Sequence, residues 1–324
     1  MCLYPKLLDN RKYKPTKKNG YNPPPKPHDQ RVLYVPVGCG RCFECRKKKS
    51  NEWKIRLAEE IRHDQTGHFV TLTFSEEKMN EIKNALKKNG EFSYEIDNEI
   101  CSYAVRHFLE LWRKHNKKSV KHWLITELGH NGTERIHLHG LIFTDKKNEI
   151  EKIWKYGKIF IGDYVNEKTI NYISKYVTKT DQMHKEYQSK IFSSKGIGAK
   201  FLERRDSELN DFNLDETNEN YRFKNGAKMN LPIYYRNKLW TEDEREYLWL
   251  KKLDEAKRYV MGVEIDIKNG DAEYYEHLNL ARIKSKLWGY GCDIKNWSQK
   301  RYEETRKKLK QKAYIDSIIK KNDA

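Results

Sequence analysis

The stretch RIHLHGLIF, residues 135–143, decides the fold that we expect for this chain. Its apolar residues, interrupted by two histidines, are typical of a buried β-strand. Side chains two apart on a strand point to the same face, so His137 and His139 would stand side by side while Leu138 enters the core. Two adjacent imidazoles form half of a site for a divalent cation, although two histidines at a sheet surface give the same pattern.

The preceding stretch HWLITELG, residues 122–129, predicts a neighbouring strand joined to the first by a five-residue turn. If Leu128 faces Glu134 across this turn, Glu127 lies on the histidine face, diagonal to the first histidine. A carboxylate beside two imidazoles leaves positions open for water or phosphate oxygens, which is the composition of a Lewis-acid site. His130 is an alternative third ligand, and an ordinary exposed acid at a turn is the alternative interpretation of Glu127.

A predicted helix at residues 167–179, EKTINYISKYVTK, carries a doubled tyrosine. Tyr172 and Tyr176 are four residues apart and therefore share one face of the helix. A free phenol has a pKa near 10, so only about one in a thousand is ionised at neutral pH. As a nucleophile it needs a neighbouring cation, for which Lys175 is the candidate, and a metal that polarises the group under attack. A tyrosine pair that packs the helix onto the sheet is the alternative.

The remaining pattern predicts an α+β domain built on an antiparallel sheet flanked by helices. Two more stretches have strand character, and two more have helical periodicity, at residues 68–74 and 158–165 and at residues 46–63 and 103–115 respectively. Residues 203–220, with seven acids, are expected to form a mobile acidic loop. Three later stretches are predicted to be helical, at residues 240–262, 273–288 and 294–321.

The composition favours a nucleic-acid partner. In 324 residues, 65 Lys and Arg outnumber 47 Asp and Glu, which gives a formal net charge of +18. A chain this positive attracts polyanions, and its 21 tyrosines and 8 tryptophans offer rings on which unpaired bases can stack. No apolar run approaches the about 18 residues of a membrane span, and no secretory signal opens the chain. We therefore expect no membrane partner and a location in the cytoplasm.

Proline and basic residues mark the N-terminal region. Seven of the eight prolines lie in residues 5–36, so the first thirty residues are expected to be an extended basic arm. A run of four cations then opens a predicted helix, where it opposes the helix dipole. Contact with DNA phosphates explains this run, and a solubilising cluster is the alternative. Its members are Arg46, Lys47, Lys48 and Lys49.

Three cysteines form a C-x2-C-x2-C turn, at Cys39, Cys42 and Cys45. Tight turns of this spacing hold thiolates at a tetrahedral Zn²⁺, which needs a fourth ligand. Cys2 is the first candidate because a Pro-rich arm can fold back, and Cys101 and Cys292 are alternatives. The spacing also occurs in iron–sulfur ligation, and three reduced cysteines in a turn need no metal at all.

Three stretches, in this order, resemble the three motifs of HUH endonucleases: FVTLTF (69–74), RIHLHGLIF (135–143) and YISKYVTK (172–179). The doubled tyrosine is similar to the branch that initiates rolling-circle replication in small single-stranded-DNA bacteriophages. Three further stretches resemble replication initiators of microviruses, specifically the gokushovirus group. They are VPVGCGRCFECRKKKSNEWKIRL, SSKGIGAKF and LPIYYRNK, and the resemblance spans residues 31–240.

The resemblance implies that His137, His139 and Glu127 hold Mg²⁺ or Mn²⁺, which clamps the scissile phosphate of an unpaired origin strand. Either Tyr172 or Tyr176 would attack and keep a 5′-phosphotyrosine link, leaving a 3′-hydroxyl for a host DNA polymerase. The other tyrosine would cleave the regenerated origin, and the circle would be resealed. No G-x-x-x-x-G-K-[ST] loop is present, so no nucleotide cofactor is expected and unwinding needs a host helicase.

We therefore expect three segments. Residues 1–66 would hold the arm, the Cys-rich turn and a basic helix, residues 67–240 an HUH nicking domain, and residues 241–324 a basic helical C-terminal region. The enzyme would act in the host cell cytoplasm. A non-enzymatic, zinc-containing nucleic-acid-binding protein is the alternative, and a metal-dependent hydrolase that activates water is a second one.

Overall fold

The chain divides into two compact units that interleave in sequence. The computed structural model describes residues 2–17, 20–22, 24–88, 93–129, 135–162, 164–180, 187–291 and 298–322. Unit 1 consists of Met1–Lys48, Asp211–Asn218 and Leu239–Ala324, and unit 2 of Lys49–Asn210 and Glu219–Lys238. The sequence predicts three consecutive segments, because composition along the chain does not tell which distant segments pack together.

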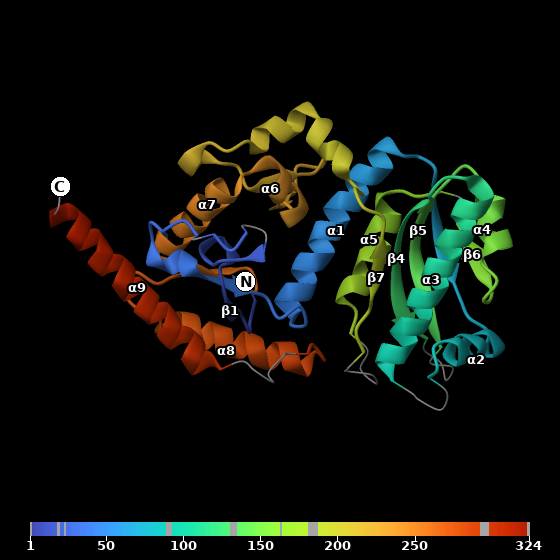
Figure 1. Ribbon diagram of the computed structural model, residues 1–324, viewed down its shortest axis with the longest axis horizontal. Coiled ribbons are helices and arrows are strands. Elements are labelled where there is room, and N and C mark those ends of the chain that lie inside the picture. The colour runs from blue at the N-terminus through green and yellow to red at the C-terminus, as the bar shows by residue number, and fades with distance from the viewer. Residues whose placement is uncertain are drawn as a thin grey trace. The chain divides into compact units, whose positions relative to one another are not determined.

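Unit 2 is built on a five-stranded antiparallel sheet, as Figure 1 shows. The strand order is β6-β3-β5-β4-β7, and every neighbouring pair is antiparallel. The expected antiparallel sheet flanked by helices is therefore confirmed. The strands are β3 (Gly67–Leu72), β4 (Lys121–Leu128), β5 (Ile136–Phe143), β6 (Ile159–Ile161) and β7 (Ile191–Ser193).

Helices cover both faces of this sheet. On one face, α2 (Glu76–Ala85), α3 (Tyr94–Asn116) and α4 (Lys147–Ile153) bury Leu138 and its neighbours in a large apolar core. On the other face, α5 (Glu167–Thr178) and part of α1 (Phe43–His63) pack against a second apolar cluster. Strand alternation sends Leu138 into the first core and the flanking histidines to the α5 face, as the sequence predicts.

Two local features position the strands and helix of the α5 face. Gly140 pairs with Leu124, and a Cβ at Gly140 would lie 2.0 Å from the Trp123 carbonyl oxygen, so only glycine allows β4 to approach β5 here. Asn166 caps the start of α5, where its side chain accepts hydrogen bonds from the backbone N–H groups of Lys168 and Thr169. The helix therefore begins at a defined residue, which fixes the direction in which its tyrosines point.

The N-terminal arm is packed rather than extended, which corrects the prediction made from its prolines. In unit 1, β1 (Lys6–Asp9) pairs antiparallel with β2 (Tyr34–Val37). Leu3, Tyr4 and Tyr13 are buried. The apolar side chains between the prolines thus find partners, and the proline within β2 is tolerated because a two-stranded sheet has only edge strands.

The predicted helix at residues 240–262 and the predicted mobile loop at residues 203–220 are also corrected. The helix α7 ends at Asp254, and a β-hairpin follows. Met261 and Gly262 form its turn with φ of 51° and 91°, as a two-residue hairpin loop of the mirror-image type requires. Residues 203–220 contain short 3-10 helices in which Ser207 and Asn210 are buried.

The remaining elements are short strands and helices. The strands are β8 (Asn220–Arg222), β9 (Lys228–Asn230), β10 (Lys257–Val260) and β11 (Val263–Asp266). The α-helices are α6 (Ile233–Leu239), α7 (Glu242–Asp254), α8 (Ala272–Leu287) and α9 (Gln299–Asn322), so the C-terminal region is largely helical as expected. The 3-10 helices are η1 (Arg11–Tyr13), η3 (Gln30–Leu33), η4 (Ala199–Glu203), η5 (Arg205–Asn210) and η6 (Leu214–Glu216). Within the described ranges, no helix has both the length and the apolar character needed to cross a bilayer.

Candidate functional site

The pairing of β4 with β5 sets the relation between the predicted carboxylate and the histidines. Glu127 lies directly opposite His137, and Leu128 pairs with Ile136 rather than with Glu134. The predicted register is therefore wrong by two residues. A shift of two preserves the face to which each side chain points, so Glu127 still lies on the histidine face.

Three donor atoms converge on this face. The Oε2 atom of Glu127 is 3.2 Å from Nε2 of His137 and 2.9 Å from Nε2 of His139, and the two Nε2 atoms are 3.0 Å apart. All three side chains are largely buried at the sheet surface, with exposed fractions of 12%, 19% and 11%. A carboxylate oxygen and two imidazole nitrogens thus form one compact donor set, which we call the triad.

The other ring nitrogens of the histidines are held by neighbouring oxygens. Nδ1 of His137 lies 3.2 Å from the Arg135 carbonyl oxygen, and Nδ1 of His139 lies 3.0 Å from Oγ1 of Thr71. A carbonyl oxygen only accepts, so Nδ1 of His137 carries the proton and its Nε2 presents a lone pair. A lone pair facing a carboxylate oxygen is repulsive unless a cation lies between them, which is the arrangement of a metal ligand with its outer-shell partner.

The spacing of the triad fits one divalent cation. Three mutually perpendicular bonds of about 2.1 Å place their donor atoms about 3.0 Å apart. The observed separations of 2.9 to 3.2 Å match that edge. The triad can therefore hold one face of an octahedral ion and leave the opposite face for water or phosphate oxygens.

A lysine lies at the edge of the triad. The Lys179 ammonium donates to Oε1 of Glu127, and its Nζ lies 5.8 Å from the centre of the Tyr176 ring. Burial opposes the charged form of the Glu127 carboxylate, but hydrogen bonds with His137 and His139 and the Lys179 charge outweigh it, and its pKa lies well below the usual range. Glu127 is therefore ionised and ready to bind a cation at neutral pH.

The tyrosine pair of α5 lies directly against the triad. The Tyr176 ring stacks on the His139 ring with centres 4.5 Å apart and an angle of 14°. The two phenol oxygens of the pair are 2.6 Å apart, and the Tyr172 side chain is 49% exposed. Burial, the hydrogen bond with Tyr172 and the charge of Glu127 raise the pKa of Tyr176 above its ordinary value.

The cation beside the tyrosines is a different residue from the one that the sequence predicts. Lys175 is exposed, and none of its described contacts involves the triad or a phenol oxygen. Lys179, three residues after Tyr176, takes that place. Its signal was present in the sequence, because residues three apart on a helix share a face.

Two further residues on β3 complete the surroundings, and the sequence predictions did not include them. Thr71 pairs with His139 across β3 and β5, and Phe69 stacks near the same imidazole with ring centres 6.1 Å apart. Phe69 also meets the edge of the Tyr172 ring at 5.9 Å. Both residues lie in the stretch FVTLTF, where period-two alternation puts them on one face.

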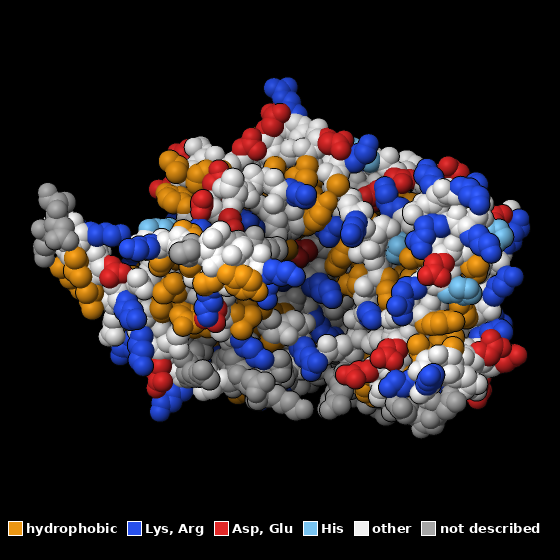
Figure 2. Space-filling model, viewed as in Figure 1, with side chains coloured by type: hydrophobic (Ala, Val, Ile, Leu, Met, Phe, Trp, Pro, Cys, Tyr) orange, Lys and Arg blue, Asp and Glu red, His pale blue; other side chains and the backbone are white. Residues whose placement is uncertain are grey.

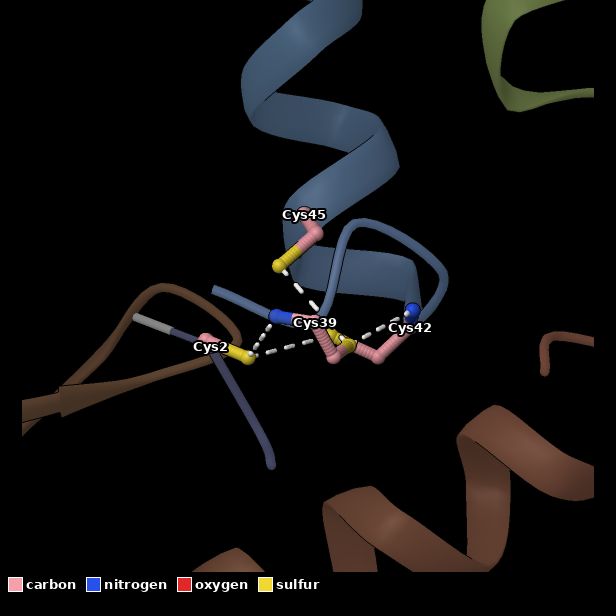
Figure 3. Close-up of side chains that lie close together, drawn as sticks. All are labelled: Cys2, Cys39, Cys42 and Cys45. Carbon is pink, nitrogen blue, oxygen red and sulfur yellow. Dashed lines mark hydrogen bonds between the residues drawn. The ribbon is translucent and has the colours of Figure 1, made fainter. Parts of the chain in front are cut away.

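In unit 1, four cysteines form a second donor cluster. The sulfur atoms of Cys2, Cys39, Cys42 and Cys45 all lie within 4.8 Å of one another. Figure 3 shows the side chains converging from three segments of the chain. Hydrogen bonds with the other three thiol groups hold the pKa of Cys39 below its usual range. Cys101 is buried in α3 of unit 2, while Cys292 and the alternative ligand His130 lie outside the described residues.

The four cations at the start of α1 differ in exposure. Arg46 is only 7% exposed, and its guanidinium lies 5.7 Å from the centre of the Tyr290 ring. Lys47, Lys48 and Lys49 are exposed. Packing within unit 1 therefore accounts for Arg46, and phosphate contact stays a prediction for the three lysines.

The sheet and triad lie inside a segment that matches a known family. Residues 67–181 match the family of the replication-associated protein ORF2. The Replication-associated protein ORF2 of Spiroplasma virus 4 is 28% identical over 193 residues, which cover 51% of this chain and 57% of the relative. The chain thus spans little more than half of that curated relative. No solved structure matches the chain.

Proposed function

We propose that this chain initiates rolling-circle replication by nicking a single-stranded DNA origin through tyrosine transesterification, as a two-tyrosine HUH enzyme of a gokushovirus-like microvirus. The family match over residues 67–181 supports a replication initiator in general. One observation carries the finer proposal: the stacking of Tyr176 on His139 puts a phenol pair against a donor set of the right spacing for one cation.

The triad would hold Mg²⁺ or Mn²⁺, and the ion would supply Lewis-acid polarisation of the scissile phosphate. The chain's own residues do the rest. A phenol oxygen forms a bond to phosphorus while the bond from phosphorus to the 3′ oxygen breaks, and the phenol proton is replaced by one on the released 3′-hydroxyl. The product is a 5′-phosphotyrosine, and the bond energy is kept for resealing because no water takes part.

Tyr172 and Tyr176 share one hydrogen bond, and this arrangement suits two successive transfers. When one phenol has given up its proton, the other donates a hydrogen bond to it across the observed 2.6 Å. Lys179 adds a positive charge beside the Tyr176 ring. The second phenol then remains available for the second cleavage, after which the freed 3′-hydroxyl attacks the first link and closes the circle.

The charge of the chain supports a DNA substrate. Lysine and arginine side chains are scattered over the face shown in Figure 2, and the formal net charge is +18. Such a surface attracts a phosphate backbone and contributes to sequence-independent affinity. Host polymerase and helicase are the proposed partners, in the host cell cytoplasm, because the product carries a 3′-hydroxyl and the origin must be unpaired.

A denaturing gel tests the proposal. Single-stranded oligonucleotides that tile the replicon carrying the gene are labelled at the 3′ end and incubated with the protein and Mn²⁺. We expect one oligonucleotide to give a labelled protein–DNA adduct, and the same oligonucleotide labelled at the 5′ end to release a fragment that a polymerase can extend. The proposal fails if wild type gives no adduct, or if a Tyr172→Phe, Tyr176→Phe double variant gives as much adduct.

The cysteine cluster is the observation that favours the alternative, a non-enzymatic zinc-containing nucleic-acid-binding protein. This alternative predicts that the oligonucleotides are bound but stay intact. A metal-dependent hydrolase gives a third outcome, in which the DNA is cleaved but no protein remains attached. The 3′-labelled gel therefore separates all three functions in one experiment.

A further inference from the structure

The cysteine cluster lies outside the segment matched by the family and far along the chain from the triad. Cys2 precedes β1, Cys39 follows β2, and the other two cysteines flank the start of α1, Cys42 just before Phe43 and Cys45 two residues after it. All of these segments belong to unit 1. Figure 3 shows the four sulfur atoms directed toward one another.

The distances between the sulfur atoms decide which chemistry fits. Cys2 and Cys42 have sulfur atoms 4.0 Å apart, as do Cys39 and Cys45. Four thiolates around one tetrahedral Zn²⁺, at bonds of about 2.3 Å, lie about 3.8 Å apart. A disulfide needs about 2.0 Å. An iron–sulfur cluster inserts several irons and sulfides between its ligands and holds them further apart.

Backbone hydrogen bonds favour the thiolate form of these side chains. The N–H groups of Tyr4 and Cys39 donate to the Cys2 sulfur at 3.3 and 3.2 Å. The N–H of Cys42 donates to the Cys39 sulfur at 3.3 Å. Metal-bound sulfur carries negative charge and is commonly supported by donors of this kind.

The position of the cluster also explains the basic run that follows it. Three cations in the first turns of α1, Arg46, Lys47 and Lys48, oppose the positive end of the helix dipole. Four thiolates and one Zn²⁺ carry a net charge of −2, and two of the thiolates belong to residues at this helix start. A negative centre there offsets both the dipole and the cations.

The cluster borders a small apolar core. Cys42 is fully buried and packs with Leu3, Tyr4 and residues of the β10–β11 hairpin and α8. A core of this size gives little stability by itself, so an added crosslink matters. We propose that Cys2, Cys39, Cys42 and Cys45 hold one structural Zn²⁺, which ties the N-terminal residues to the start of α1 and stabilises unit 1.

Zinc counting tests this proposal on the full chain. The measurements use a His137→Ala, His139→Ala background, so that the triad does not contribute metal. Zinc per chain is measured by elemental and native mass spectrometry, and zinc affinity by competition with a chelator. Co²⁺ substitution reports the geometry, because a tetrahedral thiolate site absorbs strongly in the visible range and an octahedral site does not. Cys101→Ala is the matched control, since that thiol is buried in unit 2.

We expect one zinc per chain in the background protein and in the Cys101→Ala control, with a tetrahedral cobalt spectrum. Cys2→Ala should weaken zinc binding at least 10-fold, and Cys2→His should restore it, because imidazole also ligates Zn²⁺. Cys2 lies in unit 1, so its replacement leaves the cores of unit 2 untouched. Zinc content that is unchanged in Cys2→Ala, or an octahedral cobalt spectrum, would overturn the proposal. None of these readouts depends on DNA cleavage.

Discussion

Glu127 and His137 occupy directly opposite positions on β4 and β5, with Oε2 of one 3.2 Å from Nε2 of the other. Directly opposite residues in an antiparallel pair have the shortest cross-strand separation, so two donors reach one point without strain in either strand. His139, two residues further along β5, supplies the third donor. The triad is thus a product of strand register and needs no irregular backbone.

The first prediction concerns metal choice. Two imidazoles favour a transition metal over Mg²⁺, so we expect the chain to bind Mn²⁺ more tightly than Mg²⁺. His137→Ala should weaken Mn²⁺ binding more than 10-fold, as measured by isothermal titration with a Cys39→Ser background that removes the second cluster. His277→Ala, on α8 in unit 1, is the control and should bind Mn²⁺ like the background. Equal affinity in His137→Ala and the control would contradict the assignment of the triad.

The second prediction concerns Thr71. Its hydroxyl lies 3.0 Å from Nδ1 of His139 and holds the ring so that Nε2 faces the triad. Outer-shell partners of this kind typically contribute 10- to 100-fold to metal affinity. Thr71→Val should therefore weaken Mn²⁺ binding by about 10-fold. The control is Thr73→Val, since the Thr73 hydroxyl donates to the Lys158 carbonyl oxygen instead, and a loss as large in this variant would show a general effect on β3.

The third prediction separates the two tyrosines. Tyr172 is 49% exposed and accepts a hydrogen bond from the Tyr176 hydroxyl, so we expect Tyr172 to make the first cleavage. Tyr172→Phe should abolish most of the adduct. Tyr176→Phe should still form the first adduct but should not release a resealed circle. Tyr164→Phe, at an exposed tyrosine before α5, serves as the control, and the reverse pattern in the first two variants would assign the first step to Tyr176.

The fourth prediction compares two lysines of the same helix region. Lys179 donates to Glu127 and lies beside the Tyr176 ring, whereas Lys175 is exposed. Loss of a charge aimed at the reacting group typically costs about 100-fold in rate. Lys179→Met should therefore slow adduct formation about 10- to 100-fold, with Lys168→Met as the control at the start of α5. A larger loss in Lys175→Met than in Lys179→Met would favour the original sequence prediction.

The fifth prediction concerns pH and the turn between α1 and β3. Asp64 accepts a hydrogen bond from the Thr66 N–H at 3.1 Å and lies 3.5 Å from the Lys121 ammonium. Burial opposes ionisation of this carboxyl group, but the Thr66 hydrogen bonds and the Lys121 charge outweigh it and lower its pKa. The stabilisation is therefore present above the unfolded pKa of about 3.9 and is lost as the pH falls through the folded value.

Asp64→Asn should accordingly lower the free energy of unfolding by about 1 kcal/mol at pH 7, as measured by urea denaturation. The difference from wild type should shrink as the pH falls below about 4. Asp145→Asn, at an exposed carboxylate, is the control and should differ little from wild type at any pH. A difference that grows in acid would show that the sign of the pKa shift is wrong.

Patterns along the chain were enough to predict much of the catalytic half. The alternation of RIHLHGLIF predicted both the burial of Leu138 and the shared face of His137 and His139. The four-residue spacing of Tyr172 and Tyr176 predicted their shared face on α5. These predictions hold because strand and helix periods are local properties of the backbone, so a short stretch contains them completely.

Predictions that depended on long-range packing were less reliable. The two-residue error in the β4–β5 register arose because turn length does not determine pairing, and the chosen pair lay next to the turn. The Pro-rich arm was expected to be extended, yet Leu3 and Tyr4 join an apolar core with the hairpin after α7 and with α8. Composition reports the average environment of a segment and not the partner that buries it.

By itself, the sequence determined which residues could carry chemistry: two histidines on one strand face, two phenols on one helix face, and three cysteines in one turn. Only the tertiary structure decided how these sets meet. It placed Tyr176 on His139, chose Lys179 over Lys175, and brought Cys2 to the cysteine turn. The reason is physical: periodicity fixes directions within one element, whereas the distance between elements depends on the packing of the whole core.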